Sequence, residues 1–243
     1  MLQPAEPAPQ EPTAAARLQP LAGFSGSLGQ RVYQTLRQAI LSLEYRPGEI
    51  LRKPDICAEL DVSRSPVADA VARLQAEGLV DVVPQAGTFV ARFSMQEIRE
   101  GAFLREAIEG AAIERVAAII TDDQLQLLRR NLTVQAVLVA DGDIPGFYAM
   151  DGAMHDLLLS FTGFPRLRQV SQTAWAHVNR ARQLILPVPG RVQATLAEHQ
   201  AICDAVEARD PVAARDAVRS HLRQLITYLE PLERERPDLF NPG

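Results

Sequence analysis

The four histidines of this 243-residue chain all lie in its C-terminal half and are its residues best suited to coordination chemistry. His155 follows Asp151 by four residues, so on a helix the two side chains share one face and can converge on one ion. His199 and His221 fall on the last two predicted helices, which an Asp-Pro turn should place antiparallel and adjacent. Three imidazoles and one carboxylate suit a divalent transition metal, so these four residues form a candidate metal site.

Plainer interpretations of these residues stay open. An Asp-His pair at this spacing is often a helix-surface pair, and single histidines on amphipathic helices are often hydrogen-bonded surface or core residues. If a metal binds, the ligands accept zinc first, with nickel, manganese or iron as alternatives. A metallohydrolase would need a general base beside a metal-bound water, as in His-Glu-Xaa-Xaa-His, and that motif is absent from the sequence. We therefore expect no enzyme.

A second group of residues suits contact with nucleic acid. Ser63-Arg64-Ser65-Pro66 opens a predicted helix, and the first turn of the second helix in a helix-turn-helix lies closest to DNA. Arg64 can pair with guanine or clamp a phosphate, and the hydroxyls of Ser63 and Ser65 suit phosphate oxygens. The alternative is that the serines only cap the helix and Arg64 is a solvated charge. Weaker candidates for contact with the DNA backbone are Arg52, Lys53, Gln85, Thr88 and Arg73.

The surrounding pattern predicts a small domain over residues 28–93. Apolar residues at helical spacing predict a first helix from Leu28 to Leu43, and a short helix over 54–60, a break at 61–63 and another helix follow. Two β-prone runs joined by Pro84-Gln85-Ala86-Gly87 then predict a hairpin, which in this position is a wing. Residues 1–27 are dominated by Ala, Pro, Gln and Gly, and we expect a disordered tail there.

Beyond Ser94, capping and helix-breaking residues predict helices over 95–119, 122–140, 144–161, 165–186, 190–209 and 211–230. The expected fold is mainly α: an N-terminal winged helix-turn-helix with a small β-hairpin, and a C-terminal all-α helical bundle over residues 94–232. Residues 233–243 are charged and contain proline, and we expect them to be a flexible tail.

Bulk composition narrows the partners. A net charge of −5 argues against a protein wrapped in nucleic acid, but a small DNA-binding module remains compatible with it. Residues 28–92 carry eight Lys/Arg and eight Asp/Glu, so DNA affinity must rest on charge placement and on two copies, which favours a homodimer. No apolar run is long enough for a membrane span, and two distant cysteines without a secretory signal fit the cytoplasm.

Several motifs occur in order in the first domain: Leu36-Arg37-Gln38-Ala39-Ile40, Arg46-Pro47-Gly48-Glu49-Ile50-Leu51, Val62-Ser63-Arg64-Ser65-Pro66-Val67, Glu77-Gly78-Leu79-Val80 and Gly87-Thr88-Phe89-Val90. Together they resemble the winged helix of GntR-family transcription regulators, which implies a double-stranded DNA operator. Ala68 and Ala86 stand where members of this family usually carry DNA-contacting arginines. We therefore expect reduced or altered operator specificity.

Residues 96–230 resemble the FCD ligand-binding domain of the FadR subgroup, through Leu104-Arg105-Glu106-Ala107-Ile108-Glu109, Asp151-Gly152-Ala153-Met154-His155, Glu198-His199-Gln200-Ala201-Ile202 and Ser220-His221-Leu222. The resemblance implies that the Asp-His set holds a metal whose open positions take an effector carboxylate. It also implies that Arg105 pairs with that carboxylate, although an ordinary pair with Glu109 is the alternative. Other pocket candidates are Trp175, His177, Arg180 and Arg182, unless the tryptophan is core and the arginines are solvated.

The function expected on this basis is a transcription regulator, most often a repressor in such families, whose operator binding is controlled by a small organic acid bound at or near the metal. One alternative is a metal-responsive regulator with no organic effector. A metal-dependent helical-bundle enzyme is disfavoured, because a winged helix lies on the same chain.

Overall fold

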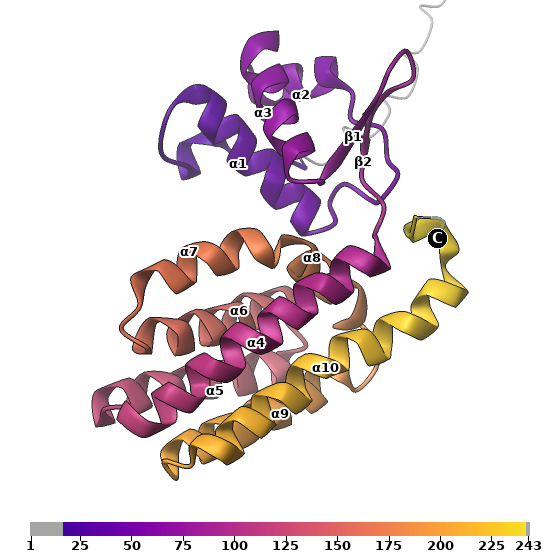
Figure 1. Ribbon diagram of the computed structural model, residues 1–243. Coiled ribbons are helices and arrows are strands. Elements are labelled where there is room, and N and C mark those ends of the chain that lie inside the picture. The colour runs from indigo at the N-terminus through magenta and orange to yellow at the C-terminus, as the bar shows by residue number, and fades with distance from the viewer. Residues whose placement is uncertain (1–16, 242–243) are drawn as a thin grey trace, which may run out of the picture.

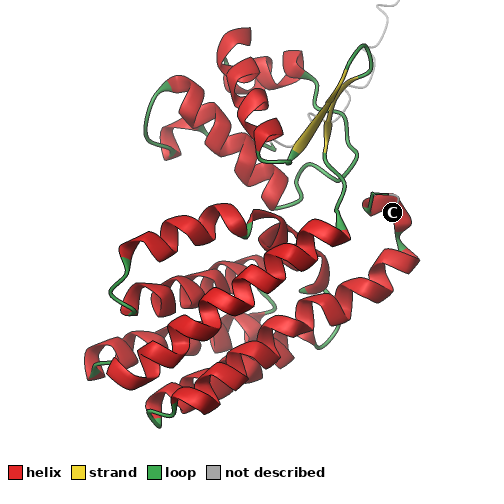
Figure 2. Cartoon of the chain, viewed as in Figure 1, coloured by secondary structure: helices red, strands yellow, loops and turns green. Residues whose placement is uncertain are grey.

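The computed structural model describes residues 17–241. A small N-terminal domain of three helices and one hairpin sits on a larger, entirely helical domain (Figure 1). The hairpin is the only sheet among these residues (Figure 2). The predicted fold class, mainly α with a winged helix-turn-helix before an α-helical bundle, is confirmed.

The N-terminal domain contains α1 (Leu28–Leu41), α2 (Lys53–Leu60), α3 (Arg64–Ala76), β1 (Val80–Val83) and β2 (Gly87–Val90). The residue that caps α2 at its C-terminus is Asp61, whose φ of 50° lies in the left-handed region and turns the chain toward α3. The two strands pair antiparallel from Val80 opposite Val90 to Val83 opposite Gly87. Gly87 has a φ of 136°, and a Cβ there would lie 3.3 Å from Ile50 Cδ1, so this turn requires glycine.

Part of the expected N-terminal tail is ordered. Leu18 is buried in the core of the first domain, η1 (Leu21–Gly23) follows, and Arg17 forms an ion pair with Glu49 at 2.5 Å. The prediction of a disordered tail over 1–27 is therefore wrong for 17–27, because Leu18 adds apolar burial and Arg17 finds a carboxylate partner. Residues 1–16 lie outside the described part of the chain.

The C-terminal domain is a bundle in which the long helices α4 and α10 run side by side (Figure 1). Its core is formed by apolar residues of α4, α5, α6, α9 and α10, including Ile113, Leu128, Met154, Ile202 and Val218. The helices are α4 (Met95–Ile119), α5 (Asp122–Asp141), α6 (Ile144–Phe161), α7 (Pro165–Ala174), α8 (Ala176–Ile185), α9 (Arg191–Glu207) and α10 (Pro211–Glu235).

Two expectations for this domain are wrong. The helix predicted over 165–186 is broken into α7 and α8 at Trp175, whose φ of −105° and ψ of 8° are not helical and whose ring packs in the core. The C-terminal tail is ordered through residue 241, because α10 continues past Pro231, η2 (Pro237–Leu239) follows, and Phe240 packs against Phe93 at 5.7 Å between ring centroids. Residues 242–243 lie outside the described chain.

The junction between the domains is held by both ends of the helical domain. Phe93 N–H donates to Leu239 O at 2.9 Å and Asn241 N–H donates to Phe93 O at 2.8 Å, so the C-terminal segment pairs with the interdomain linker. A second contact joins the two domains: Nε2 of His177, on α8, lies 3.1 Å from the backbone oxygen of Glu77, at the end of α3. The α8 helix therefore contacts the winged helix directly.

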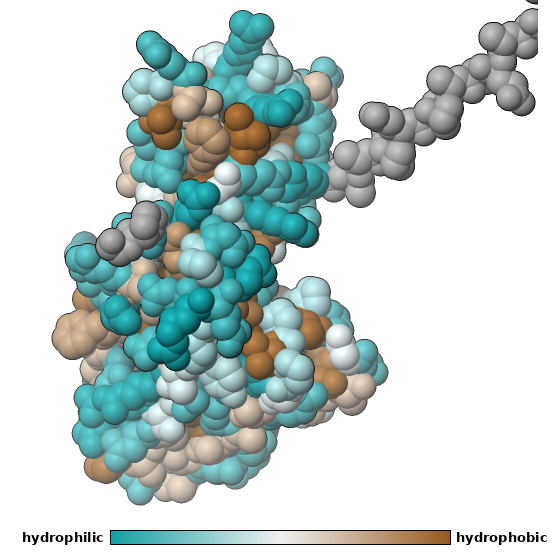
Figure 3. All heavy atoms as spheres, turned by 90° about the vertical axis from the view of Figure 1, so that its right-hand side faces the viewer, coloured by the Kyte–Doolittle hydropathy of each residue, from teal (hydrophilic) through white to brown (hydrophobic). Residues whose placement is uncertain are grey.

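Within residues 17–241, no helix combines the length and apolar character that crossing a bilayer requires. The face seen in Figure 3 is mainly hydrophilic, with hydrophobic side chains in separate small patches over both domains.

Candidate metal centre and DNA-contacting surface

The four predicted metal ligands converge inside the helical domain. Asp151 and His155 come from α6, His199 from α9 and His221 from α10. One ligand atom from each lies within 4.8 Å of all the others, and all four residues are buried. Asp151 Oδ1 is 3.3 Å from His155 Nε2 and 3.4 Å from His199 Nε2. The i, i+4 pair and the antiparallel final helices thus bring together the residues that sequence spacing had selected.

Each imidazole is oriented by a hydrogen bond on its outer nitrogen. His155 Nδ1 donates to Glu109 Oε2 at 2.5 Å, and His221 Nδ1 donates to Glu198 Oε2 at 2.7 Å. His199 Nδ1 donates to Gln135 Oε1 at 2.8 Å. With Nδ1 bonded outward in each ring, the Nε2 atoms face the centre of the cluster, where those of His155 and His221 lie 3.3 Å apart. This is the arrangement of metal-binding histidines.

Burial favours the neutral form of two of the three candidate ligand histidines. Burial lowers the pKa of His221 to about 4 and that of His199 well below its usual value, so both rings are neutral at pH 7. Burial would raise the pKa of Glu109, but Arg105 and His155 outweigh it and lower that pKa. Burial also opposes ionisation of Glu198, whose pKa is nevertheless lowered by hydrogen bonds from Arg191 and His221. Neutral imidazoles held by ionised carboxylates are suited to a cation.

Two atoms of the cluster lack a protein partner. Asp151 Oδ1 and His199 Nε2 are buried and form no hydrogen bond within the described residues, although they face each other. A buried acceptor left unpaired is costly, and a carboxylate oxygen and an imidazole lone pair are both good ligands for a divalent transition ion. The donor set therefore fits a metal such as zinc.

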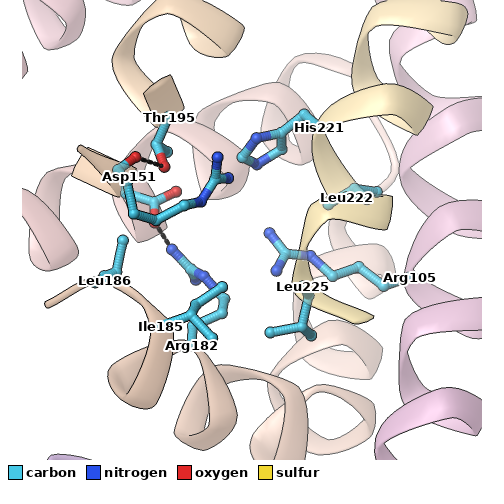
Figure 4. A pocket seen from close by; sticks show the side chains of 10 residues that line it. Arg105, Asp151, Arg182, Ile185, Leu186, Thr195, His221, Leu222 and Leu225 are labelled. Atoms are coloured by element: carbon cyan, nitrogen blue, oxygen red, sulfur yellow. Dashed lines mark hydrogen bonds and ion pairs between the residues drawn. The ribbon is translucent and has the colours of Figure 1, made fainter. Parts of the chain in front are cut away.

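A cavity beside the cluster is lined by Arg105, Arg182 and Arg191. Figure 4 shows Arg105, Arg182 and His221 pointing toward the same space, with Arg182 paired to Asp151. The other two arginines have buried or half-buried carboxylate partners: Arg105 lies 2.6 Å from Glu109, and Arg191 makes two hydrogen bonds to Glu198 at 2.6 and 2.8 Å. Arg105 pairs with Glu109 and also lines the cavity, so its pairing with an effector carboxylate stays a prediction.

The other residues expected in the pocket lie elsewhere. His177 and Arg180, three residues apart on α8, face the domain junction, while Arg182 faces the cavity because it lies on the other side of the helix. The structure does not bring the side chain of either His177 or Arg180 into this cavity. Arg180 is fully buried with its guanidinium 4.5 Å from the Phe93 ring centroid. Trp175 is a core residue packed 5.3 Å from the Arg105 guanidinium, as its alternative interpretation held.

Sequence reasoning missed Arg191 and the two acceptors Gln135 and Glu198, which orient ligand histidines. A signal existed for the pair of Arg191 and Glu198: they are seven residues apart on one helix and so share a face, and Glu198 precedes His199. For Gln135 there was none, because α5 contacts α9 only through the tertiary packing of the bundle.

Because Gln135 orients the ring of His199, we expect its replacement to change zinc affinity. A Gln135→Met substitution should weaken zinc affinity about 10- to 100-fold, since His199 then loses the acceptor that fixes its ring. Gln135→Glu keeps an acceptor oxygen and should stay near wild type. Competition with a chromophoric zinc chelator measures both, and a Met variant as tight as wild type would remove Gln135 from the site.

The first turn of α3 is exposed, as DNA contact requires. Ser63, Arg64 and Ser65 are exposed, Arg64 forms no hydrogen bond or ion pair within residues 17–241, and the Ser63 side chain forms no capping hydrogen bond. At the start of α2, Arg52 is exposed and Lys53 half-buried, and Gln85 is exposed at the wing turn. These six residues remain candidates for DNA contact.

The structure turns the Thr88 side chain away from the surface, whereas Arg73 stays a weak candidate for contact with the DNA backbone. Thr88 is only 5% exposed, because alternation along β2 turns its side chain inward, so it is unavailable to a phosphate. Arg73 lies in the last turn of α3, far from Arg64 along the helix, and packs its guanidinium 3.8 Å from the Tyr33 ring centroid. Ala68 and Ala86 are exposed, so their positions leave short apolar side chains on this surface.

Comparison with known proteins agrees with this arrangement. Residues 28–90 match the bacterial regulatory proteins of the gntR family, and residues 100–224 match the FCD domain. An uncharacterised HTH-type transcriptional regulator of Streptomyces ambofaciens is 34% identical over 221 residues, covering 90% of this chain and 93% of that protein. The transcriptional repressor RspR of Escherichia coli is 29% identical over 214 residues, covering 88% and 94%.

Solved structures share the fold. Escherichia coli McbR/YncC superposes with a TM-score of 0.74 at 18% identity, covering 86% of this chain and 99% of that chain. A putative GntR regulator from Rhodococcus sp. RHA1 gives 0.71 at 26% identity, covering 83% and 99%.

A winged helix-turn-helix followed by an FCD domain defines a DNA-binding transcription regulator. The chain belongs to the GntR family of bacterial regulatory proteins and has an FCD domain, as its relatives in that family show. The same relatives are regulators, which confirms that the chain is not an enzyme.

Proposed function

We propose that this regulator is a cytoplasmic repressor that binds its operator as a homodimer and releases it when a small organic acid binds beside a divalent metal ion. Zinc is the favoured ion, with nickel, manganese or iron as alternatives. Residues Asp151, His155, His199 and His221 would hold the ion, and Arg105, Arg182 and Arg191 would orient the acid.

One observation carries the metal part of the proposal. The Oδ1 of Asp151 and the Nε2 of His199 are buried, face each other and have no hydrogen-bond partner within residues 17–241, while the other two histidine Nε2 atoms converge on the same point. An ion at that point would satisfy all four atoms at once. When bound, it would supply positive charge that attracts a carboxylate.

The α8 helix supports a route from this site to the DNA-binding domain. Its Arg182 is paired with the ligand Asp151, while His177 on another face contacts Glu77 O at the end of the helix that carries Arg64. A ligand that moves Arg182 would therefore shift a helix that contacts the winged helix-turn-helix domain. In a dimer, the spacing of the two recognition helices must match the spacing of the two operator half-sites. A small rotation of the DNA-binding domains is therefore enough to lose operator binding.

A His177→Ala variant tests this route. It should bind zinc and acid like wild type, since His177 lies outside the cavity, but the acid should change its operator affinity less than it changes that of wild type. Fluorescence anisotropy with labelled operator measures the change, and an undiminished response would exclude His177 from the route.

The whole proposal is tested with full-length protein on operator sequences enriched from random double-stranded DNA. Operator affinity is compared for zinc-loaded protein, chelator-treated protein and zinc-loaded protein with small acids. Release by an acid only when zinc is loaded supports the proposal. A response to zinc alone would favour the metal-responsive alternative.

A further inference from the structure

We infer that the acid bound in this cavity is a short dicarboxylate, and that Arg182 selects for its second carboxylate. The inference rests on the proposed function, because it takes the Asp-His cluster to hold a divalent ion. The proposed function left open the charge of the acid and the residue that recognises its second carboxylate.

Two of the three cavity arginines are already neutralised by groups that stay in place. Arg105 pairs with Glu109, and Arg191 pairs with Glu198. Each of these carboxylates also accepts a hydrogen bond from a ligand histidine, so neither is free to move to another partner. The charge balance of the cavity therefore depends on Asp151 and Arg182.

Within residues 17–241, Asp151 is the one carboxylate that forms an ion pair with Arg182, and both residues are buried. If Asp151 becomes a ligand of a divalent ion, its single negative charge neutralises half of the charge on the ion. The other half and the whole charge of Arg182 then remain without a counterion in a buried space. Uncompensated buried charge is costly, so the loaded cavity favours a ligand with two negative charges.

Arg182 can bind such a ligand and still keep its contacts with Asn179 and Tyr148. Its Nη1 donates to Asn179 Oδ1 at 3.3 Å, and its guanidinium lies 5.0 Å from the Tyr148 ring centroid. A guanidinium released from Asp151 is suited to a bidentate pair with a carboxylate.

The remaining walls decide between carbon acids and inorganic dianions. Ile185, Leu186, Leu222 and Leu225 line the same cavity as the arginines. Phosphate or sulfate would leave these apolar side chains without a matching surface, whereas a short hydrocarbon link between two carboxylates would contact them. The Thr195 side chain also lines the cavity.

The test compares succinate with butyrate, which has the same carbon number but a methyl group in place of the second carboxylate. Zinc-loaded full-length protein is titrated calorimetrically at constant free zinc, and thermal stabilisation gives a second readout. Succinate should bind about 10- to 100-fold more tightly, the range expected for one charge-assisted hydrogen-bonded contact. Arg182→Gln should remove most of this preference, Arg182→Lys should retain part of it, and Arg168→Gln, on the outer surface, should leave it unchanged.

Zinc titration of the same samples separates the inference from the proposed function. Butyrate binding as tightly as succinate, inorganic phosphate matching succinate, or a preference that survives in Arg182→Gln would each overturn the inference while the metal site stands. Absence of acid binding by protein that binds zinc overturns the inference and favours a metal-only signal. Absence of zinc binding overturns the proposed function itself, and the inference with it.

Discussion

An Asp151→Ala/His199→Ala variant is expected to bind no zinc at concentrations that saturate the wild-type protein. The two substitutions remove the buried atoms that lack a protein partner, and they leave only two of four ligands. Zinc at about 100 times its dissociation constant should stabilise wild type by about 2.7 kcal/mol and should not stabilise the variant. Elemental analysis and thermal unfolding, each with and without zinc, measure the two effects.

The control for this variant is His177→Ala, which removes a histidine outside the cluster and should keep about one ion per chain. Because loss of Asp151 also leaves Arg182 without its carboxylate, the zinc-free variant should unfold at a lower temperature than wild type. The shift on adding zinc is therefore compared within each protein. A double variant that still takes up one ion per chain would show that the cluster is not the site.

Arg64→Ala is expected to cause the largest loss of operator affinity among single substitutions in the winged helix. Arg64 is exposed in the first turn of α3, where side chains of a helix-turn-helix reach base edges. A bidentate contact with guanine contributes about 1–3 kcal/mol, so each winged helix should lose about 5- to 150-fold in affinity. Anisotropy titrations at one fixed salt concentration measure this, because DNA affinity depends strongly on salt.

Arg73→Ala is the matched control, since it removes the same charge from the same helix. Arg73 packs over Tyr33 at the far end of α3, so its loss should change operator affinity much less. If Arg73→Ala weakened binding as strongly as Arg64→Ala, the effect would be one of net charge, and the assignment of Arg64 as a reading residue would be wrong.

Local pattern predicted most of the elements and the convergence of the metal ligands. The Asp151 and His155 pair required only helical spacing, and the Asp-Pro turn correctly placed the last two helices side by side. The prediction failed where tertiary contacts decide the structure. Leu18 and Phe240 order the two ends of the described chain by packing against distant residues, and no local pattern contains that information.

The break in the helix at Trp175 explains why only some of the predicted cavity residues line the cavity. A continuous helix over 165–186 gives no basis for deciding which side faces the cavity. In the structure, Arg182 faces the metal ligands, whereas Arg180 lies against Phe93 in the linker between the domains. The orienting acceptors Glu109 and Gln135 come from two further helices, so they become recognisable only when the bundle is assembled.

The central claim is that an acid bound beside the metal controls DNA binding. It is tested most directly by measuring operator affinity of zinc-loaded wild type, at constant free zinc, with and without saturating succinate, beside the Asp151→Ala/His199→Ala variant. We expect succinate to weaken operator binding by wild type about 5- to 150-fold, the usual range for coupling between two sites, and to leave the variant unaffected. Equal operator affinity of wild type under zinc-loaded, zinc-free and succinate-bound conditions would contradict the account.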